Sequence, residues 1–152
     1  GSSGSANGVG TLASFNFPMG ITTDGTNLYV ADHDNHLIRQ IVISTKAVTT
    51  LAGGGSGVGT DGTGTTASFN SPTGITTDGT NLYVAGHDNH LIRQIVISTG
   101  EVTTLAGRSS GGGSAIDGNG TAARFRVPTG ITTDGRVLYV IGKSNHVIRK
   151  IE

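Results

Sequence analysis

The chain has 152 residues, with 26 glycines, four phenylalanines, three tyrosines and neither cysteine nor tryptophan, so it lacks the large side chains that one central core requires. Ten basic residues balance ten acidic ones, and this zero net charge argues against a general binder of nucleic acid or of a membrane surface. Disulfide bonds and thiolate metal sites are excluded, and no apolar run approaches the roughly 18 residues needed to cross a bilayer.

Three copies of one unit fill most of the chain. Residues 20–53 and 74–107 differ at only three aligned positions, which indicates recent duplication or engineering, and a looser copy begins at residue 130. A fixed period of this length is typical of stacked or radially arranged units that cannot bury their faces alone. We therefore divide the chain into a remnant of an expression tag at residues 1–5 and repeats at residues 6–53, 54–107 and 108–152. The third repeat is longer by two residues in its glycine- and serine-rich loop, residues 108–115.

Four short strands are predicted within each full copy. In the first copy, Asp24-Gly25 is a strong hairpin signal after a strand that begins at Gly20. The third strand is β-branched and carries apolar residues on both alternating faces, which indicates a sheet covered on both sides. The expected strands of this copy cover residues 20–23, 28–31, 37–43 and 48–52. The third copy ends after Ile151 and is expected to lack the fourth strand.

Several motifs recur in a fixed order along the copies. These are Asn-Leu-Tyr-Val-Ala-Asp, Asn-His-Leu-Ile-Arg-Gln-Ile and Val-Thr-Thr-Leu-Ala-Gly, together with the connector that begins Asp-Gly-Thr-Gly at residues 61–64. Together they resemble NHL repeats, whose Asn-His-Leu stands at residues 35–37 and 89–91, with Asn-His-Val at residues 145–147. The resemblance implies an all-β fold, a β-propeller of four-stranded antiparallel blades around a channel, commonly six per ring and here three per chain.

A homodimer is expected because a three-blade arc leaves two apolar faces and a sheet edge in water. Two copies would complete a six-bladed ring, with the third blade of each packed on the first blade of its partner; a nine-bladed trimer is the open alternative. Residues 1–107 hold three basic and seven acidic residues, whereas residues 108–152 hold seven and three. These net charges of −4 and +4 favour head-to-tail contact.

The polar residues that recur once per copy are interpreted as architectural. For the repeated carboxylate and the repeated guanidinium the sequence leaves two interpretations open: a charge-assisted hydrogen bond between them that locks each blade, or side chains that face the channel. The phenylalanines at 15, 69 and 125 are expected to fill the gaps between blades. The structural motif comprises Asn35, His36, Arg39, Asn89, His90, Arg93, Asn145, His146, Arg149, Asp24, Asp78 and Asp134.

Metal and cofactor sites are not predicted. The His-x-x-His pairs His33/His36 and His87/His90 are weak candidates for zinc or nickel, because two imidazoles alone make a weak site and the third copy has no equivalent of the first histidine. The Asp-Gly segments at residues 61–64 and 117–120 resemble the start of a calcium loop, but they lack its further carboxylates, and tight turns explain them.

The sequence predicts a structural and interaction module without catalysis, because it contains no nucleophile elbow, no cysteine nucleophile and no His-Glu-x-x-His pair. Its main expected partner is a second copy of itself, with a protein or peptide as a further ligand. A propeller that binds peptide, glycan or RNA on its ring face is the first alternative, with arginines 124, 126 and 136 making the third copy basic. A metal-dependent lyase or hydrolase with channel imidazoles is the second.

Overall fold

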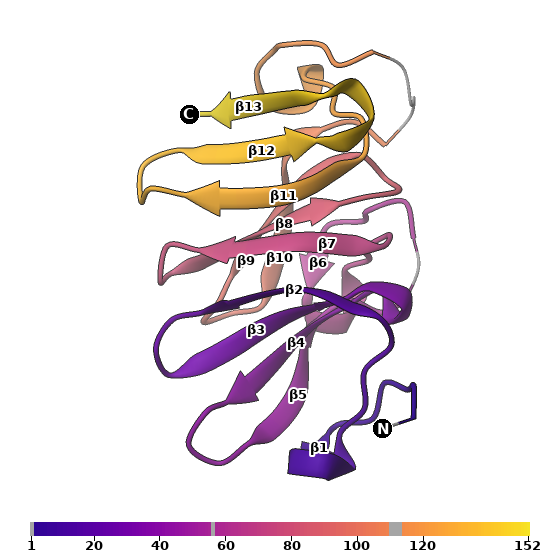
Figure 1. Ribbon diagram of the computed structural model, residues 1–152, viewed down its shortest axis with the longest axis vertical. Helices are drawn as coiled ribbons and strands as arrows, with labels where there is room; N and C mark the ends of the chain where they lie inside the picture. Colours follow the sequence, from indigo (N-terminus) through magenta and orange to yellow (C-terminus); the bar gives the residue numbers. More distant parts are fainter. Residues whose placement is uncertain (1, 56, 110–113) are drawn as a thin grey trace.

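The computed structural model describes residues 2–55, 57–109 and 114–152, and it confirms an all-β architecture of antiparallel sheets. Figure 1 shows three sheets that follow one another along the long axis. The first residue of the expected tag remnant and residues 110–113 of the long loop lie outside the described residues. No helix in the described part of the chain is long and apolar enough to span a membrane.

The first two sheets each contain five strands, and the third contains three. The first sheet has the order β1-β5-β4-β3-β2, the second β6-β10-β9-β8-β7 and the third β11-β12-β13. The strands are β1 (Gly8–Val9), β2 (Pro18–Thr23), β3 (Asn27–Asp32), β4 (Leu37–Val42), β5 (Ala47–Ala52), β6 (Gly62–Thr63), β7 (Pro72–Thr77), β8 (Asn81–Gly86), β9 (Leu91–Val96), β10 (Glu101–Gly107), β11 (Pro128–Thr133), β12 (Leu138–Gly142) and β13 (Val147–Ile151). Short 3-10 turns join them at η1 (Gly10–Leu12), η2 (His33–Asn35), η3 (Gly64–Thr66), η4 (Gly120–Ala122) and η5 (Lys143–Asn145).

The hairpin predicted at Asp24-Gly25 joins β2 to β3. Gly25 adopts a φ of +88°, which favours glycine, and the Asp24 carboxylate accepts hydrogen bonds from the backbone N–H groups of Thr26 and Asn27 at 2.8 and 2.7 Å. This side chain therefore closes its own turn, which explains why the Asp-Gly pair recurs in every copy.

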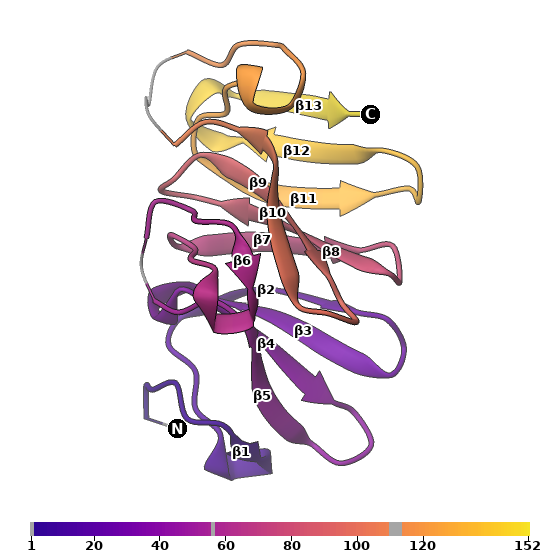
Figure 2. The ribbon, with the colours of Figure 1, turned by 180° about the vertical axis from the view of Figure 1, so that it is seen from behind.

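The two-residue strands β1 and β6 were not predicted. Each belongs to the connector that precedes its copy, and each pairs with the last strand of the same copy, β1 with β5 and β6 with β10. Figure 2 shows β6 beside β10 on the side of the molecule away from the view of Figure 1. The last strand of each full copy is thus hydrogen-bonded along both edges.

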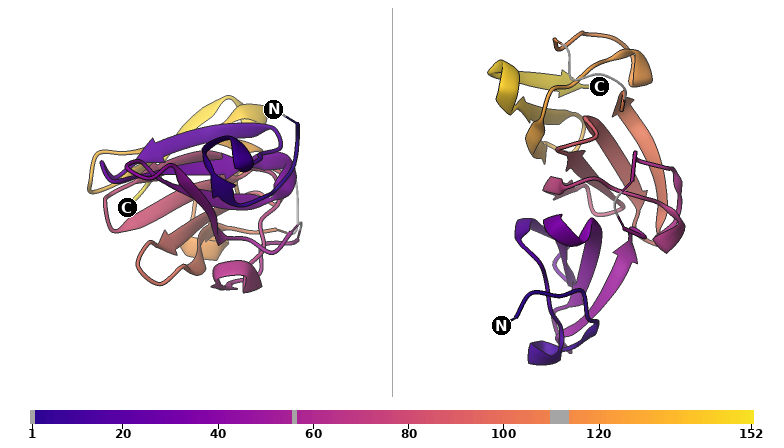
Figure 3. Two further views of the ribbon diagram at one scale, coloured as in Figure 1. Left: turned by 90° about the horizontal axis from the view of Figure 1, so that it is seen from below. Right: turned by 90° about the vertical axis from the view of Figure 1, so that its right-hand side faces the viewer.

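Two apolar clusters hold neighbouring sheets together. One joins the first and second sheets around Phe69, and the other joins the second and third around Phe125. Both phenylalanines are at most 3% exposed, which confirms that these two fill the gaps between units, whereas Phe15 is only partly buried and lines the apolar cavity at the free face of the first sheet. The sheets follow an arc with the two termini at opposite ends (Figure 3, right).

The innermost strands β2, β7 and β11 approach one another closely. A Cβ atom at Gly74 of β7 would lie 2.5 Å from the carbonyl oxygen of Thr129 in β11, and one at Gly20 of β2 would lie 2.2 Å from that of Thr73 in β7. Glycine is required at these positions because any side chain would collide with the neighbouring backbone.

Candidate interaction surfaces

The repeated arginine binds the connector of its own copy. In the second copy, the guanidinium of Arg93 donates to the carbonyl oxygens of Ser68 and Thr60 at 2.9 and 3.0 Å and to the carboxylate of Asp61 at 2.8 Å. It also lies 5.4 Å from the ring centroid of Phe69. Arg39 and Arg149 repeat this arrangement against residues 6–15 and 116–125. The arginine therefore fastens the connector to the sheet.

The repeated carboxylate does not pair with the repeated arginine, which was one of the two interpretations left open by the sequence. Asp24 binds the hydroxyl of Tyr29 at 2.7 Å, and Asp78 binds that of Tyr83 at 2.8 Å. The Asp-Gly turn places each carboxylate beside the tyrosine five residues later, away from the guanidinium. The buried acidic partner of Arg39 is instead Asp32, at 3.0 Å, and the second copy has glycine at this position.

The hydrogen bond between Asp24 and Tyr29 shifts the pKa of both side chains. Burial raises the pKa of Asp24, but hydrogen bonds from Asn27, Tyr29 and Thr26 outweigh burial and lower this pKa to about 2. Burial and the hydrogen bond to Asp24 raise the pKa of Tyr29 to about 12. The pair therefore stabilises the fold only while Asp24 is ionised and Tyr29 is protonated.

Removing this hydrogen bond with Tyr29→Phe should lower stability by about 1 kcal/mol at neutral pH. Because the pKa of folded Asp24 lies below its ordinary value of 3.8, its contribution is present above about pH 4 and is lost as the pH falls toward 2. Because the pKa of folded Tyr29 is raised above 10, its contribution is present below pH 10 and is lost as the pH rises toward 12. Urea midpoints across the pH range should show both losses in the parent and smaller ones in Tyr29→Phe.

Tyr139→Phe is the matched control for this prediction. In the third copy the hydroxyl of Tyr139 lies 3.4 Å from the Asp134 carboxylate at an exposed position, so its loss should change the urea midpoint less. Equal losses for the two variants would contradict the role assigned to the short Tyr29 hydrogen bond.

The motif histidines connect one sheet to the next. His36 and His90 adopt left-handed backbone conformations, and their Nδ1 atoms accept hydrogen bonds from the backbone N–H groups of Ser71 and Val127 at 3.0 and 3.3 Å. His146 has the same backbone conformation, with a φ of +57°, but no such partner within the described ranges. The position equivalent to Ser71 and Val127 in the first copy is Phe17.

Within each His-x-x-His pair, the two histidines bind different partners. His33 and His87 lie with their ring centroids 6.2 Å apart, and each Nδ1 bonds the carboxylate of the following aspartate at 2.6 Å. Burial raises the pKa of Asp88, but hydrogen bonds from Ser71 and His87 outweigh burial and lower this pKa. Over the residues that the structure describes, no three His, Cys, Asp or Glu side chains are grouped as a metal ion would require. The packing of sheets thus brings together one histidine from each pair.

Apolar side chains are exposed at the two ends of the arc. At the first sheet, Phe17, Met19 and Ile21 are 55–62% exposed, beside a shallow apolar cavity of 300 Å³. At the third sheet, Ile141 and Ile148 are 48% and 75% exposed, beside a cavity of 400 Å³. Patches of this kind on a protein surface mark interaction sites.

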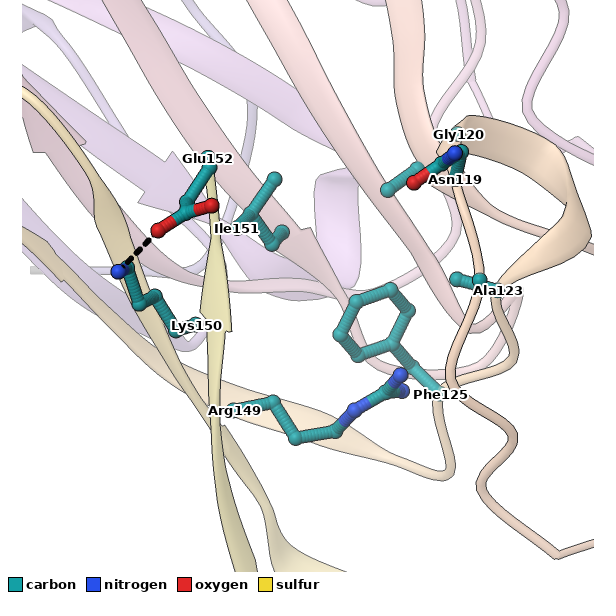
Figure 4. Close-up of a pocket in the computed structure, with 10 residues that line it drawn as sticks. Asn119, Gly120, Ala123, Phe125, Arg149, Lys150, Ile151 and Glu152 are labelled. Carbon is teal, nitrogen blue, oxygen red and sulfur yellow. Dashed lines mark ion pairs between the residues drawn. The ribbon is translucent and has the colours of Figure 1, made fainter.

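A groove runs along the outer edge of the third sheet. It encloses 540 Å³ between β13 and residues 118–120. Figure 4 shows residues 149–152 on one wall and Asn119, Gly120 and Ala123 facing them, with the ring of Phe125 between. An ion pair joins Lys150 to Glu152 at the end of β13.

Comparisons with known proteins find curated relatives with a similar sequence and solved structures with a similar fold. No family model matches the chain. It is 39% identical over 93 residues to NHL repeat-containing protein 2 of Gallus gallus and 32% identical over 136 residues to that of Bos taurus. These matches cover 60% and 82% of the chain but only 13% and 19% of the relatives.

Two solved structures from Bacteroides thetaiotaomicron have a similar fold. A protein of unknown function matches with a TM-score of 0.72 and 27% identity over 82% of this chain and 32% of that one. An auxiliary nutrient binding protein matches with a TM-score of 0.71 and 25% identity, over 87% and 36%. In both cases this chain corresponds to about a third of the compared structure.

Proposed function

The chain belongs to the NHL-repeat β-propeller family, and on that premise we propose that it is a non-catalytic interaction module that closes a ring by self-association. The third sheet of one copy packs against the first sheet of a second copy. Two copies supply six sheets, which is the ring size that the family resemblance implies.

The observation that carries the proposal is a difference in burial between equivalent positions. Ile75 lies between two sheets and is 6% exposed, whereas its equivalent Ile21 at the first end is 62% exposed. Ile92 is fully buried, whereas its equivalent Ile148 at the third end is 75% exposed. The two ends therefore present the two halves of a contact that the chain already makes twice internally, and association would bury both.

Two polar features support head-to-tail association. Residues 108–152 hold seven basic and three acidic residues and residues 1–53 hold two and three, so two copies of the basic end repel one another more than the basic end repels the first end. His146 is held in the conformation in which His36 and His90 accept a backbone N–H from the next sheet. In the proposed ring its acceptor nitrogen receives the N–H of Phe17 from the second copy.

The mass in solution tests the proposal. Light scattering coupled to size-exclusion chromatography should give twice the chain mass of 15.3 kDa at micromolar concentration. Three times the chain mass would replace the six-sheet ring with a nine-sheet ring. A mass of 15.3 kDa throughout the concentration series would overturn self-association.

A further inference from the structure

A buried carboxylate distinguishes the first copy from the second. The side chain of Asp32 accepts hydrogen bonds from the guanidinium of Arg39 at 3.0 Å and from the carboxamide of Asn35 at 2.8 Å. It also accepts one from the backbone N–H of Asn16 at 2.7 Å. Because Asp32 and Arg39 are both fully buried, this carboxylate completes a closed site on which a charged donor and two neutral donors converge.

The second copy keeps the donors and lacks the carboxylate. The donors are Arg93, Asn89 and the N–H of Asn70, and Gly86 stands at the position of Asp32. Asn89 is only 3% exposed, and among the described residues neither its Oδ1 nor its Nδ2 atom has a hydrogen-bond partner. A buried amide without partners is costly, so this side chain marks a place where a ligand with complementary groups would be stabilised.

The charge of Arg93 is only partly compensated. Arg93 is fully buried like Arg39, but its ion-pair partner Asp61, at 2.8 Å, is 53% exposed. Burial lowers the pKa of Arg93 more than the nearby carboxylate of Asp61 raises it. A buried cation in this environment attracts an anion that is small enough to enter among the surrounding side chains.

The carboxamide of Asn89 indicates how large that anion can be. A Cβ atom on Gly86 would lie 2.1 Å from the Oδ1 atom of Asn89, so the carboxamide stands where the side chain of Asp32 begins in the first copy. Asn35 instead lies beside Asp32 and donates to it. If Asn89 turns to the position of Asn35, it frees a planar space of the size of its own carboxamide, and formate has the same number of non-hydrogen atoms.

We propose that the second copy binds a small free carboxylate, of the size of formate, in place of the Asp32 side chain. The carboxylate accepts hydrogen bonds from the guanidinium of Arg93, the turned carboxamide of Asn89 and the N–H of Asn70. It thereby neutralises a buried cation and satisfies a buried amide. The inference goes beyond self-association and does not depend on it, because these residues all belong to the second copy of one chain.

The third copy repeats the arrangement in a more exposed form. It has Gly142 and Asn145 at the same positions, and a Cβ atom on Gly142 would lie 2.3 Å from the Oδ1 atom of Asn145. Its arginine, Arg149, is 13% exposed, whereas Arg93 is fully buried. Water competes more effectively for an exposed guanidinium, so the third copy should bind the same anion more weakly.

The melting temperature measures binding to the full chain. Sodium formate at about 100 mM should raise it by about 3–6 °C relative to sodium chloride at the same concentration, with saturation at a dissociation constant on the order of 10 mM. Sodium pivalate has the same carboxylate on a bulky group and should give no saturable rise. Equal rises with formate, pivalate and chloride would mean a general salt effect and would overturn the proposal.

Gly86→Asp supplies the carboxylate covalently. It should raise the melting temperature in chloride and abolish most of the response to formate, because the side chain then occupies the site as in the first copy. Asp32→Gly is the matched variant, since it should lower the melting temperature in chloride and enlarge the response to formate. A Gly86→Asp variant that responds to formate as strongly as the parent would contradict the assigned site.

Side-chain resonances locate the ligand and test the role of Asn89. The carboxamide signals of Asn89 and the backbone amide of Asn70 should shift on titration with formate, equally in the parent and in Ile148→Glu, which changes an exposed side chain of the third sheet. Asn89→Ala should weaken formate binding about fivefold and change the melting temperature in chloride little, because it removes an amide that has no partner. Undiminished binding to Asn89→Ala, or shifts confined to the third copy, would overturn the proposal.

Discussion

Replacing Ile148 by glutamate should convert the proposed dimer into folded monomers. Ile148 is 75% exposed in the single chain, so the substitution leaves the sheet intact, whereas its equivalents Ile38 and Ile92 are fully buried between sheets. In the ring the new carboxylate would be buried without a partner, and the dissociation constant should rise by about 100-fold or more, roughly 3 kcal/mol. Sedimentation or light scattering across a concentration series would measure the change, and circular dichroism would verify the fold.

Three further variants show whether the contact is the proposed one. Ile21→Glu, at the opposite end, should have the same effect, because both ends form one interface. Val58→Glu, which adds the same charge at a connector side chain that is 72% exposed, should leave the mass unchanged. Ile148→Lys should also dissociate the dimer, although it makes the basic end more basic, because burial of an unpaired charge outweighs attraction at long range. A dimer that survives Ile148→Glu and Ile21→Glu would place the interface elsewhere.

His146→Ala tests the finer geometry of the same contact. The equivalent His90 joins two sheets within the chain, so His90→Ala should lower the urea midpoint. His146→Ala should leave the midpoint of a monomeric background unchanged and weaken association about fivefold. Loss of monomer stability in His146→Ala would contradict the assignment of its acceptor nitrogen to a second copy.

The hairpins and strands of the repeated copies could be predicted from the sequence, because they depend on local sequence patterns. The Asp-Gly hairpin and the β-branched third strand, which is apolar on both faces, predict their elements without any knowledge of neighbours. The strands β1 and β6 could not be predicted, because Gly-Val and Gly-Thr carry no signal of their own and become strands only where β5 and β10 offer a free edge.

Some features of the interaction surfaces could likewise be predicted from the sequence, and others could not. The number of copies predicts exposed apolar ends, and Ile21 and Ile148 lie there. Recurrence identifies Asp24 and Arg39 as structural but contains no information about their partners, so the sequence left open whether they pair with each other. The buried partner of Arg39 is Asp32, the one carboxylate that the first copy has and the second lacks. The approach of His33 to His87 arises from packing between sheets and has no local signature.

Arg39→Ala should be among the most destabilising single substitutions in the chain. The guanidinium and the carboxylate of Asp32 are both fully buried, and they lie 3.0 Å apart. Removing the arginine leaves a buried carboxylate whose remaining hydrogen bonds, among the described residues, come from Asn35 and the N–H of Asn16, and connector carbonyls lose their donor. The loss should be about 3–5 kcal/mol, a large fraction of the stability of a small domain.

The same substitution in the other copies forms a graded series. Arg93 is equally buried, but its acidic partner Asp61 is 53% exposed. Arg93→Ala therefore leaves no buried charge without a partner and should reduce stability by about 2–3 kcal/mol. Arg149 is 13% exposed and pairs with Asp117, which is 99% exposed, so Arg149→Ala should have an effect of about 1 kcal/mol. Urea unfolding in an Ile148→Glu background, where dissociation does not contribute, would measure all three.

The second copy provides the rescue that distinguishes a stranded charge from a general packing defect. Asp32→Gly recreates in the first copy the glycine that stands at position 86 in the second. Combined with Arg39→Ala, it removes the unpaired carboxylate, so the double variant should be more stable than Arg39→Ala alone by about 1–2 kcal/mol, and its total loss should approach that of Arg93→Ala. If the two losses simply added, the buried carboxylate would not be the cause, and the effect of Arg39 would have to come from the connector carbonyls and the Phe15 ring that it covers.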